Sequence, residues 1–137
     1  MKLKTLLLIF ILYTPLANAV NLVCQAETRS SLMSYGSVDC SNGCESRSDE
    51  SFSIVFDSNN NKIIEVTDFQ LYNGEGVYEE KMKITPSKVY FQIPHMSGNR
   101  DHYMGVTIDR TSGVFYAYSE DLRNSYDGKC KVGKKLF

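Results

Sequence analysis

Four cysteines behind an N-terminal export pattern constrain this chain more than any other feature. The sequence opens MKLKTLLLIFILYTPLANA, where two lysines precede an apolar run and Ala17-Asn18-Ala19 forms an A-x-A cleavage site. This arrangement is typical of a secretory signal peptide, and the apolar run is too short to anchor a protein stably in a bilayer. We therefore expect residues 1–19 to be removed and residues 20–137 to form one domain in an oxidising compartment, the periplasm or the exterior.

Charge and the cysteine context exclude several classes of partner. The net charge of the chain is −1, and removal of Lys2 and Lys4 makes it more negative, so no strong positive field favours nucleic acid or an anionic membrane. The residue before Cys24 is Val23, where lipoprotein processing needs a small residue, and no second long apolar run follows. The sequence thus predicts neither a nucleic-acid partner nor a membrane anchor, it contains no cofactor motif, and it leaves the oligomeric state open.

Short alternating segments separated by turns rich in Asn, Gly and Ser predict strands, and long helical periodicity is absent. Strands are predicted at 21–26, 52–56, 62–66, 77–84, 89–93, 103–108, 114–118 and 126–132, with a short strand near 33–38 and a single helical turn at 119–123 as further expectations. About eight strands at roughly 8–12-residue spacing indicate an all-β fold, a small, mostly antiparallel β-barrel or sandwich.

An even number of cysteines in an exported chain indicates two disulfides, for which three connectivities exist. An up-and-down barrel places its first and last strands side by side, which favours Cys24–Cys130 and leaves Cys40 and Cys44 for each other. The stretch DCSNGCESRSDE, residues 39–50, has Asn-Gly between its cysteines and can bend tightly enough for this bond. Neither a second zinc knuckle nor a C-x-x-C redox spacing is present, so a disulfide-stapled loop is the favoured interpretation.

Two histidines flank one predicted hairpin loop, PHMSGNRDH. His95 and His102 could approach across the hairpin and, with Asp101, hold a metal; one of them could also serve a serine nucleophile. Two histidines and one carboxylate are a thin ligand set without a recognised motif, and no G-x-S-x-G stretch exists. We therefore expect exposed loop residues here, with no catalytic, metal or cofactor site.

Aromatic and basic side chains allow two interpretations each. Nine aromatic residues lie on or beside predicted strands, where cross-strand packing is favoured over a recognition surface; they are Tyr72, Tyr78, Tyr90, Phe91, Tyr103, Phe115, Tyr116, Tyr118 and Tyr126. The tail GKCKVGKKLF carries Lys129, Lys131, Lys134 and Lys135. These lysines could bind an anionic partner, but we favour their protecting an edge strand from aggregation.

The C-terminal third resembles a known group of proteins. IDRTSGVFYAY followed by YDGKCKVGKKLF, together with LVCQA, is similar to small exported proteins of Gram-negative bacteria that carry an I-x-R-x-(S/T)-G turn, a G-x-C segment and a Lys-Leu-Phe terminus. The resemblance implies a β fold and periplasmic or secreted location in such a bacterium, but no activity. More loosely, the plan is similar to periplasmic inhibitors of c-type lysozyme, although SGNRDHY has two more residues before the tyrosine than their S-G-x-x-Y loop.

Long polar loops on a stapled scaffold without a catalytic set favour a non-catalytic function. We expect an inhibitor or immunity-type factor that binds another protein through the 28–51 connection and the 94–102 loop, with Asn99, Arg100, His102 and Tyr103 as binding residues. Two alternatives remain open from the sequence. An eight-stranded barrel can enclose a small apolar ligand as a carrier, and a hydrolase using His95 or His102 is the less favoured one.

Overall fold

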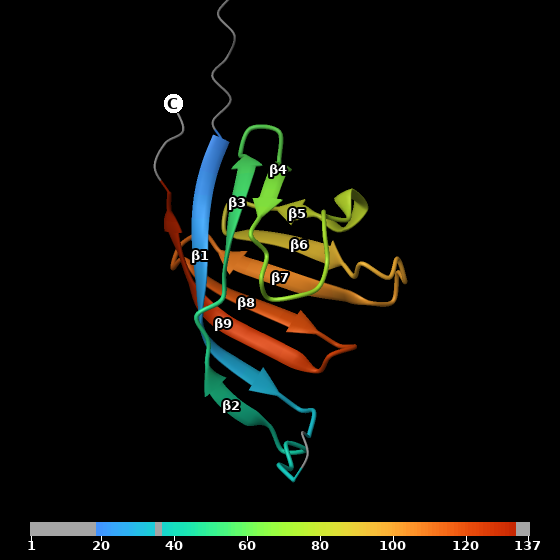
Figure 1. Ribbon diagram of the computed structural model, residues 1–137. Helices are drawn as coiled ribbons and strands as arrows, with labels where there is room; N and C mark the ends of the chain where they lie inside the picture. The colour runs from blue at the N-terminus through green and yellow to red at the C-terminus, as the bar shows by residue number, and fades with distance from the viewer. Residues whose placement is uncertain (1–18, 35–36, 134–137) are drawn as a thin grey trace, which may run out of the picture.

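The computed structural model describes residues 19–34 and 37–133, so the predicted signal peptide lies outside the described residues apart from Ala19 (Figure 1). The strands are β1 (Ala19–Ser31), β2 (Cys44–Arg47), β3 (Ser51–Asp57), β4 (Lys62–Thr67), β5 (Lys83–Ile84), β6 (Lys88–Pro94), β7 (Tyr103–Asp109), β8 (Val114–Ser119) and β9 (Asn124–Val132). One 3₁₀ turn, η1, covers Glu79–Lys81. The predicted all-β class is confirmed.

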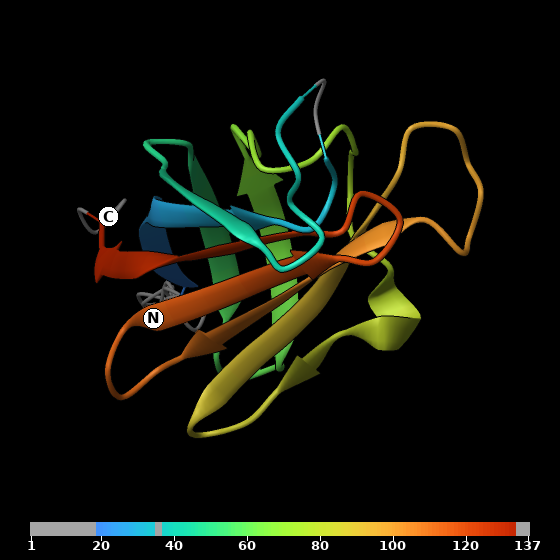
Figure 2. The same cartoon turned by 90° about the horizontal axis from the view of Figure 1, so that it is seen from below.

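All nine strands belong to one antiparallel sheet in the order β4-β3-β1-β9-β8-β7-β6-β5, with β2 paired to β1 alone. The sheet curls into a nearly closed barrel, in which β1, β3 and β4 cross β6, β7 and β8 (Figures 1 and 2). The barrel stays open between β4 and β5. There the Ile63 N–H of β4 donates to the Met82 sulfur at 3.0 Å, so a side chain bridges part of the gap that no strand closes.

The longest strand, β1, changes its partner halfway. Residues 19–25 pair with β3, and residues 28–31 pair with β2, while β9 lies along the other edge throughout. The register slips between Ala26 and Thr28, which is a β-bulge. A bulge bends a strand and reverses which faces its side chains point to. The second half of β1 therefore leaves the barrel with β2 as an arm (Figure 1).

Strand alternation fills the barrel interior with apolar side chains. Phe52 lies at its centre, with ring centroids 5.1 Å from Phe69, 6.4 Å from Phe91 and 5.2 Å from Phe115. Further fully buried side chains of this core are Ile54, Phe56, Val89, Ile93, Met104, Val106 and Ile108. Because large side chains occupy this space, the barrel has an ordinary packed core.

Both predicted disulfides form. Cys24 and Cys130 are register partners on β1 and β9, so their bond joins the first and last strands across a sequence separation of 106. Cys40 and Cys44 are bonded within the connection between β1 and β2. No free cysteine remains among the described residues.

Several local predictions are wrong. The alternating stretch 77–84 forms η1 and only the two-residue β5, because the segment from Thr67 onward crosses the open side of the barrel instead of extending its edge. Met33, Ser34, Ser37 and Val38 are not part of a strand, residues 35–36 lie outside the described residues, and β2 lies further on, at Cys44–Arg47. The turn after Ser119 is not helical, since Arg123 adopts φ 50° and the chain reverses directly into β9.

The interpretation of the lysine tail also needs correction. Strand β9 lies between β1 and β8 as far as Lys129, so Lys129 is not on a sheet edge, whereas Lys131 has a register partner on β1 alone, Val23. Their side chains lie on the outer surface, where Lys129 is 3.8 Å from Glu27. Lys134 and Lys135 are outside the described residues.

Two glycines in the C-terminal third have structural roles. Gly113 has φ 74° and its carbonyl accepts the Cys130 N–H at 2.7 Å, which ties the β7–β8 turn to β9. A Cβ on Gly128 would lie 2.1 Å from the Gln25 carbonyl oxygen, so only glycine fits opposite the β1 bulge. Both glycines therefore serve the fold around the Cys24–Cys130 bond.

Candidate functional site

Three connections gather at one end of the barrel, which we call the loop end: residues 32–43, 95–102 and 120–123. They leave β1, β6 and β8, respectively, and Figures 1 and 2 show them at the same end of the molecule. The short turns 85–87 and 110–113 lie at the opposite end, which we call the turn end. A hydrogen bond from Leu32 to Arg123 joins the first connection to the third, and Tyr72 links the third to the second through Asp121 and His95.

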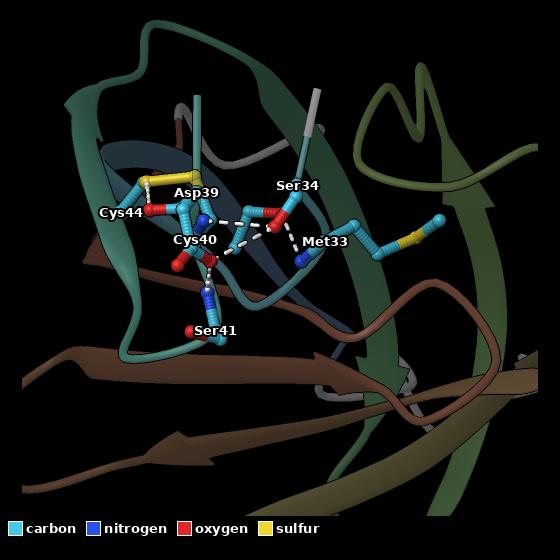
Figure 3. The surroundings of a disulfide bond; sticks show 7 residues. Met33, Ser34, Asp39, Cys40, Ser41 and Cys44 are labelled. Atoms are coloured by element: carbon cyan, nitrogen blue, oxygen red, sulfur yellow. Dashed lines mark hydrogen bonds between the residues drawn. A yellow bond between two sulfur atoms is a disulfide. The ribbon is translucent and has the colours of Figure 1, made fainter. Parts of the chain in front are cut away.

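The stapled loop, residues 32–43, is ordered by polar contacts around its disulfide (Figure 3). The Ser34 hydroxyl accepts the Cys40 N–H at 3.0 Å and lies 3.2 Å from an Asp39 carboxylate oxygen, which also accepts the Ser41 N–H at 2.9 Å. The Gly43 N–H donates to the Cys40 carbonyl at 2.8 Å, and Gly43 adopts φ 91°. The hydrogen bonds from Ser41 and Ser34 lower the pKa of Asp39.

The stapled loop exposes apolar side chains. Leu32, Met33 and Val38 are 45%, 40% and 57% exposed, respectively. Figure 3 shows the Met33 side chain pointing away from the disulfide. A groove of about 450 Å³ runs between this loop and the 120–123 turn; it is lined by Leu32, Met33, Ser34, Ser41, Asp121 and Arg123.

A buried polar cluster joins the 120–123 turn to the barrel. The Tyr72 hydroxyl lies 3.0 Å and 2.9 Å from the two Asp121 carboxylate oxygens, and the Ser119 hydroxyl donates to the same carboxylate. Burial raises the pKa of Asp121, but these hydrogen bonds outweigh it and the net pKa is lowered. Burial, then the hydrogen bond to Asp121 and the charge of that carboxylate, raise the pKa of Tyr72, which stays a protonated donor at neutral pH. The Leu32 N–H donates to the Arg123 carbonyl at 3.0 Å and links the turn to the stapled loop.

The two histidines do meet across the hairpin, as the sequence suggested. Their ring centroids are 6.1 Å apart, and the backbone N–H of His95 donates to the backbone carbonyl of His102 at 3.1 Å. The His95 ring packs edge-on against Tyr72 at 5.4 Å, while its Nδ1 lies 2.9 Å from the Ser97 hydroxyl. The 95–102 loop is thereby connected through Tyr72 to Asp121. In residues 19–34 and 37–133, no three His, Cys, Asp or Glu side chains are placed to hold a metal ion.

The four predicted binding residues separate into two groups. Arg100 and Tyr103 line a hollow of about 420 Å³ together with Tyr78, Glu80, Lys81 and Gln92. There the Arg100 guanidinium pairs with Glu80 and lies 5.4 Å from the Tyr78 ring centroid. His102 lies on the other side of the loop with His95, and Asn99 shapes the loop by accepting the Asp101 N–H at 3.1 Å.

The aromatic residues divide between the core and the surface. Phe91, Phe115, Tyr126 and Tyr72 are buried, whereas Tyr116 and Tyr118 are exposed on the outer face of β8. Tyr90 packs beside Gly105, and its hydroxyl accepts the Gln92 amide at 2.7 Å. Some of the predicted aromatic residues therefore pack in the core, and others are displayed on the surface.

Sequence reasoning missed the residues that unite the loop end. The sequence indicated Tyr72 only as one of nine aromatic residues on or beside predicted strands, and it gave Asp121 no role in a site. Their contact spans 49 residues of sequence, so no local pattern could reveal it. The exposed Leu32, Met33 and Val38 lie in the 28–51 connection, which the sequence indicated as a binding region without singling out these side chains. Apolar residues in such a segment of an otherwise polar loop were the available signal.

Comparisons with known proteins add no identity to this geometry. The chain matches no protein-family model, and neither a curated protein nor a solved structure matches it. None of the helical segments in the described ranges is long and apolar enough to cross a membrane. Function must therefore be argued from the loop end itself.

Proposed function

We propose that this protein is exported and binds another protein through its loop end, as an inhibitor or immunity-type factor without catalytic activity. The observation that carries the proposal is the stapled loop, where Leu32, Met33 and Val38 are exposed on a segment held by a disulfide. Exposed apolar groups bordered by polar ones are typical of protein interfaces. A loop ordered before binding loses less conformational entropy in a complex.

The neighbouring connections extend this surface. The groove beside the stapled loop contains Asp121 and Arg123, and contacts through Tyr72 lead from there to the 95–102 loop. Arg100 and Tyr103 are anchor types that recur in protein interfaces. A partner that covered the stapled loop and these neighbours would meet an apolar centre with a polar rim, which is the usual anatomy of such interfaces.

The packed interior gives the carrier alternative no support. Phe52, Phe91 and Phe115 occupy the centre of the barrel, where a lipocalin-like ligand would lie. The hydrolase alternative has a serine beside a histidine, since Ser97 and His95 are in contact. The Ser97 contact is exposed and local, since Ser97 follows His95 by two residues and shapes the same loop.

The test is a capture experiment with the oxidised mature chain, residues 20–137, as bait. Periplasmic extract, culture medium and host secretions serve as sources, and bound proteins are identified by mass spectrometry. A triple variant, Leu32→Ser/Met33→Ser/Val38→Ser, removes the apolar centre, and Ile64→Ser/Val114→Ser is the matched control because those side chains are exposed elsewhere, 55% and 44%.

The proposal expects one saturable partner that the wild type and the control capture and the triple variant does not. Equal capture by all three baits would place the interface elsewhere. A folded bait that retains nothing from any source would contradict the binding function.

A further inference from the structure

The arm formed by β1 and β2 carries an arginine with an unsatisfied donor. The Arg29 Nε is buried and has no hydrogen-bond partner within residues 19–34 and 37–133. The two ion pairs found among the described residues use Arg100 and Lys129, and neither involves Arg29. A buried donor of a charged group without an acceptor is costly, so its persistence in a folded protein suggests that something else supplies the acceptor.

The position of Arg29 follows from the β1 bulge. After the bulge, Arg29 pairs with Ser46 of β2 and with Tyr126 of β9. The bulge turns Arg29 and Ser31 toward the inner face of the arm, the face that bears the stapled loop. The guanidinium carbon lies 5.8 Å from the centroid of the Tyr126 ring, which orients the planar group.

A pocket of about 460 Å³ lies in front of this arginine, and we call it the Arg29 pocket. It is lined by Arg29, Ser31, Val38, Cys40, Cys44 and Ser46. Two serine hydroxyls therefore border the guanidinium, and the disulfide and Val38 form an apolar wall. Of the described residues that line the pocket, Arg29 carries a positive charge and none is acidic.

We propose that the Arg29 pocket receives a glutamate or aspartate side chain of the protein partner. A guanidinium binds a carboxylate through two parallel hydrogen bonds, and the serine hydroxyls can donate to the remaining lone pairs. One positive charge matches the single charge of a carboxylate better than the double charge of a phosphate. The apolar wall fits the methylene groups that carry the carboxylate. This inference rests on the proposed function and names the chemistry of the partner at one position.

The test uses small probes, so it does not depend on finding the partner. Isotope-labelled mature protein is titrated with N-acetyl-glutamate N-methylamide and, separately, with the glutamine analogue at the same ionic strength. The Arg29 Nε–H signal and the Ser46 backbone amide are followed by NMR. The glutamate probe should shift both signals, and the glutamine probe should not.

Two variants locate the response. Arg29→Gln should weaken the response of the Ser46 amide to the glutamate probe by at least about tenfold, since a charge-assisted hydrogen bond is lost. Arg47→Gln should leave the response of the Ser46 amide unchanged. Arg47 follows Ser46 on β2, but it lines a groove on the outer face with Glu27 and Lys129. The wild-type comparison of the two probes remains decisive even where a variant fails to fold.

Equal shifts with both probes, no shift with either, or a response that survives Arg29→Gln would overturn the carboxylate assignment. Such a result would leave the capture experiment untouched, because capture depends on the apolar centre of the stapled loop. Conversely, a shift by the glutamate probe with no captured partner would keep the pocket and reject the binding function proposed above.

Discussion

The two ends of this barrel use their residues differently. At the turn end, the residues around Gly113 hold the backbone of the turns in place. The Asp109 carboxylate accepts two turn N–H groups, at 2.8 Å and 2.9 Å. The Arg110 side chain donates to the Thr85 carbonyl at 2.8 Å. At the loop end, apolar and charged side chains are held in place without being buried. Residues that the fold requires thus concentrate at one end, and residues that the fold leaves free concentrate at the other.

The two disulfides provide the strongest test of this contrast. In Cys24→Ala/Cys130→Ala, the loss of a 106-residue closure should lower the free energy of unfolding by about 4–5 kcal/mol. Cys40→Ala/Cys44→Ala removes a bond between residues separated by only 4 positions in the sequence, and it should lower the free energy of unfolding by about 2 kcal/mol. Urea unfolding followed by circular dichroism measures both. Equal losses would mean that the barrel does not depend on joining its first and last strands.

A glycine pair sharpens the same contrast at single positions. Gly128→Ala would place a Cβ 2.1 Å from the Gln25 oxygen and should cost about 3 kcal/mol or more. Gly98→Ala lies in the 95–102 loop with φ 72° and no atom within 4 Å, so only the backbone conformation is strained, at about 1 kcal/mol. Thermal unfolding of both variants gives the comparison. A Gly128→Ala protein as stable as Gly98→Ala would contradict the close approach at the bulge.

The Tyr72–Asp121 contact should make the loop end sensitive to pH. Tyr72→Phe removes a donor to the carboxylate and should cost about 1–2 kcal/mol at neutral pH. The pKa of Asp121 is lowered below 3.8 in the folded protein, so the stabilisation is present above the unfolded pKa and is lost as pH falls through the lower folded value. Unfolding at pH 7 and in acid should therefore show the difference shrinking below about pH 4.

Tyr116→Phe is the matched control for this experiment. Its side chain is exposed on the outer face of β8, so the variant should match the wild type at both pH values. A Tyr72→Phe penalty that is the same in acid as at neutral pH would show that packing, and not the carboxylate contact, accounts for it.

The smallest effect on stability is expected at the predicted binding residues. Arg100→Ala/Tyr103→Ala removes an exposed ion pair, which contributes at most about 1 kcal/mol, but should weaken partner binding about tenfold. Lys88→Ala/Tyr116→Ala also removes one cationic side chain and one tyrosine, but away from the hollow, and should leave affinity unchanged. Isothermal titration with the captured partner measures both. Unchanged affinity in the first variant would remove Arg100 and Tyr103 from the interface.

The sequence predicted the elements that depend on local pattern. Alternation identified the β3–β4 hairpin and strands β6, β7 and β8, and barrel closure implied the Cys24–Cys130 bond. The sequence did not predict features that depend on contacts between residues far apart in the chain. Residues 77–84 alternate like a strand, yet the chain there crosses the open side of the barrel, and the β1 bulge that turns Arg29 inward has no signature in its own residues. Of the candidate site, the loops were found, but the Tyr72 link between them was not.

Hydrogen–deuterium exchange on the bait, free and with its captured partner bound, tests the central claim most directly. The account predicts slower exchange in residues 32–43, 95–102 and 120–123, with the turns at 85–87 and 110–113 unchanged. Protection confined to the turn end, or to the outer face of β6, β7 and β8, would contradict the assignment of the loop end as the binding surface.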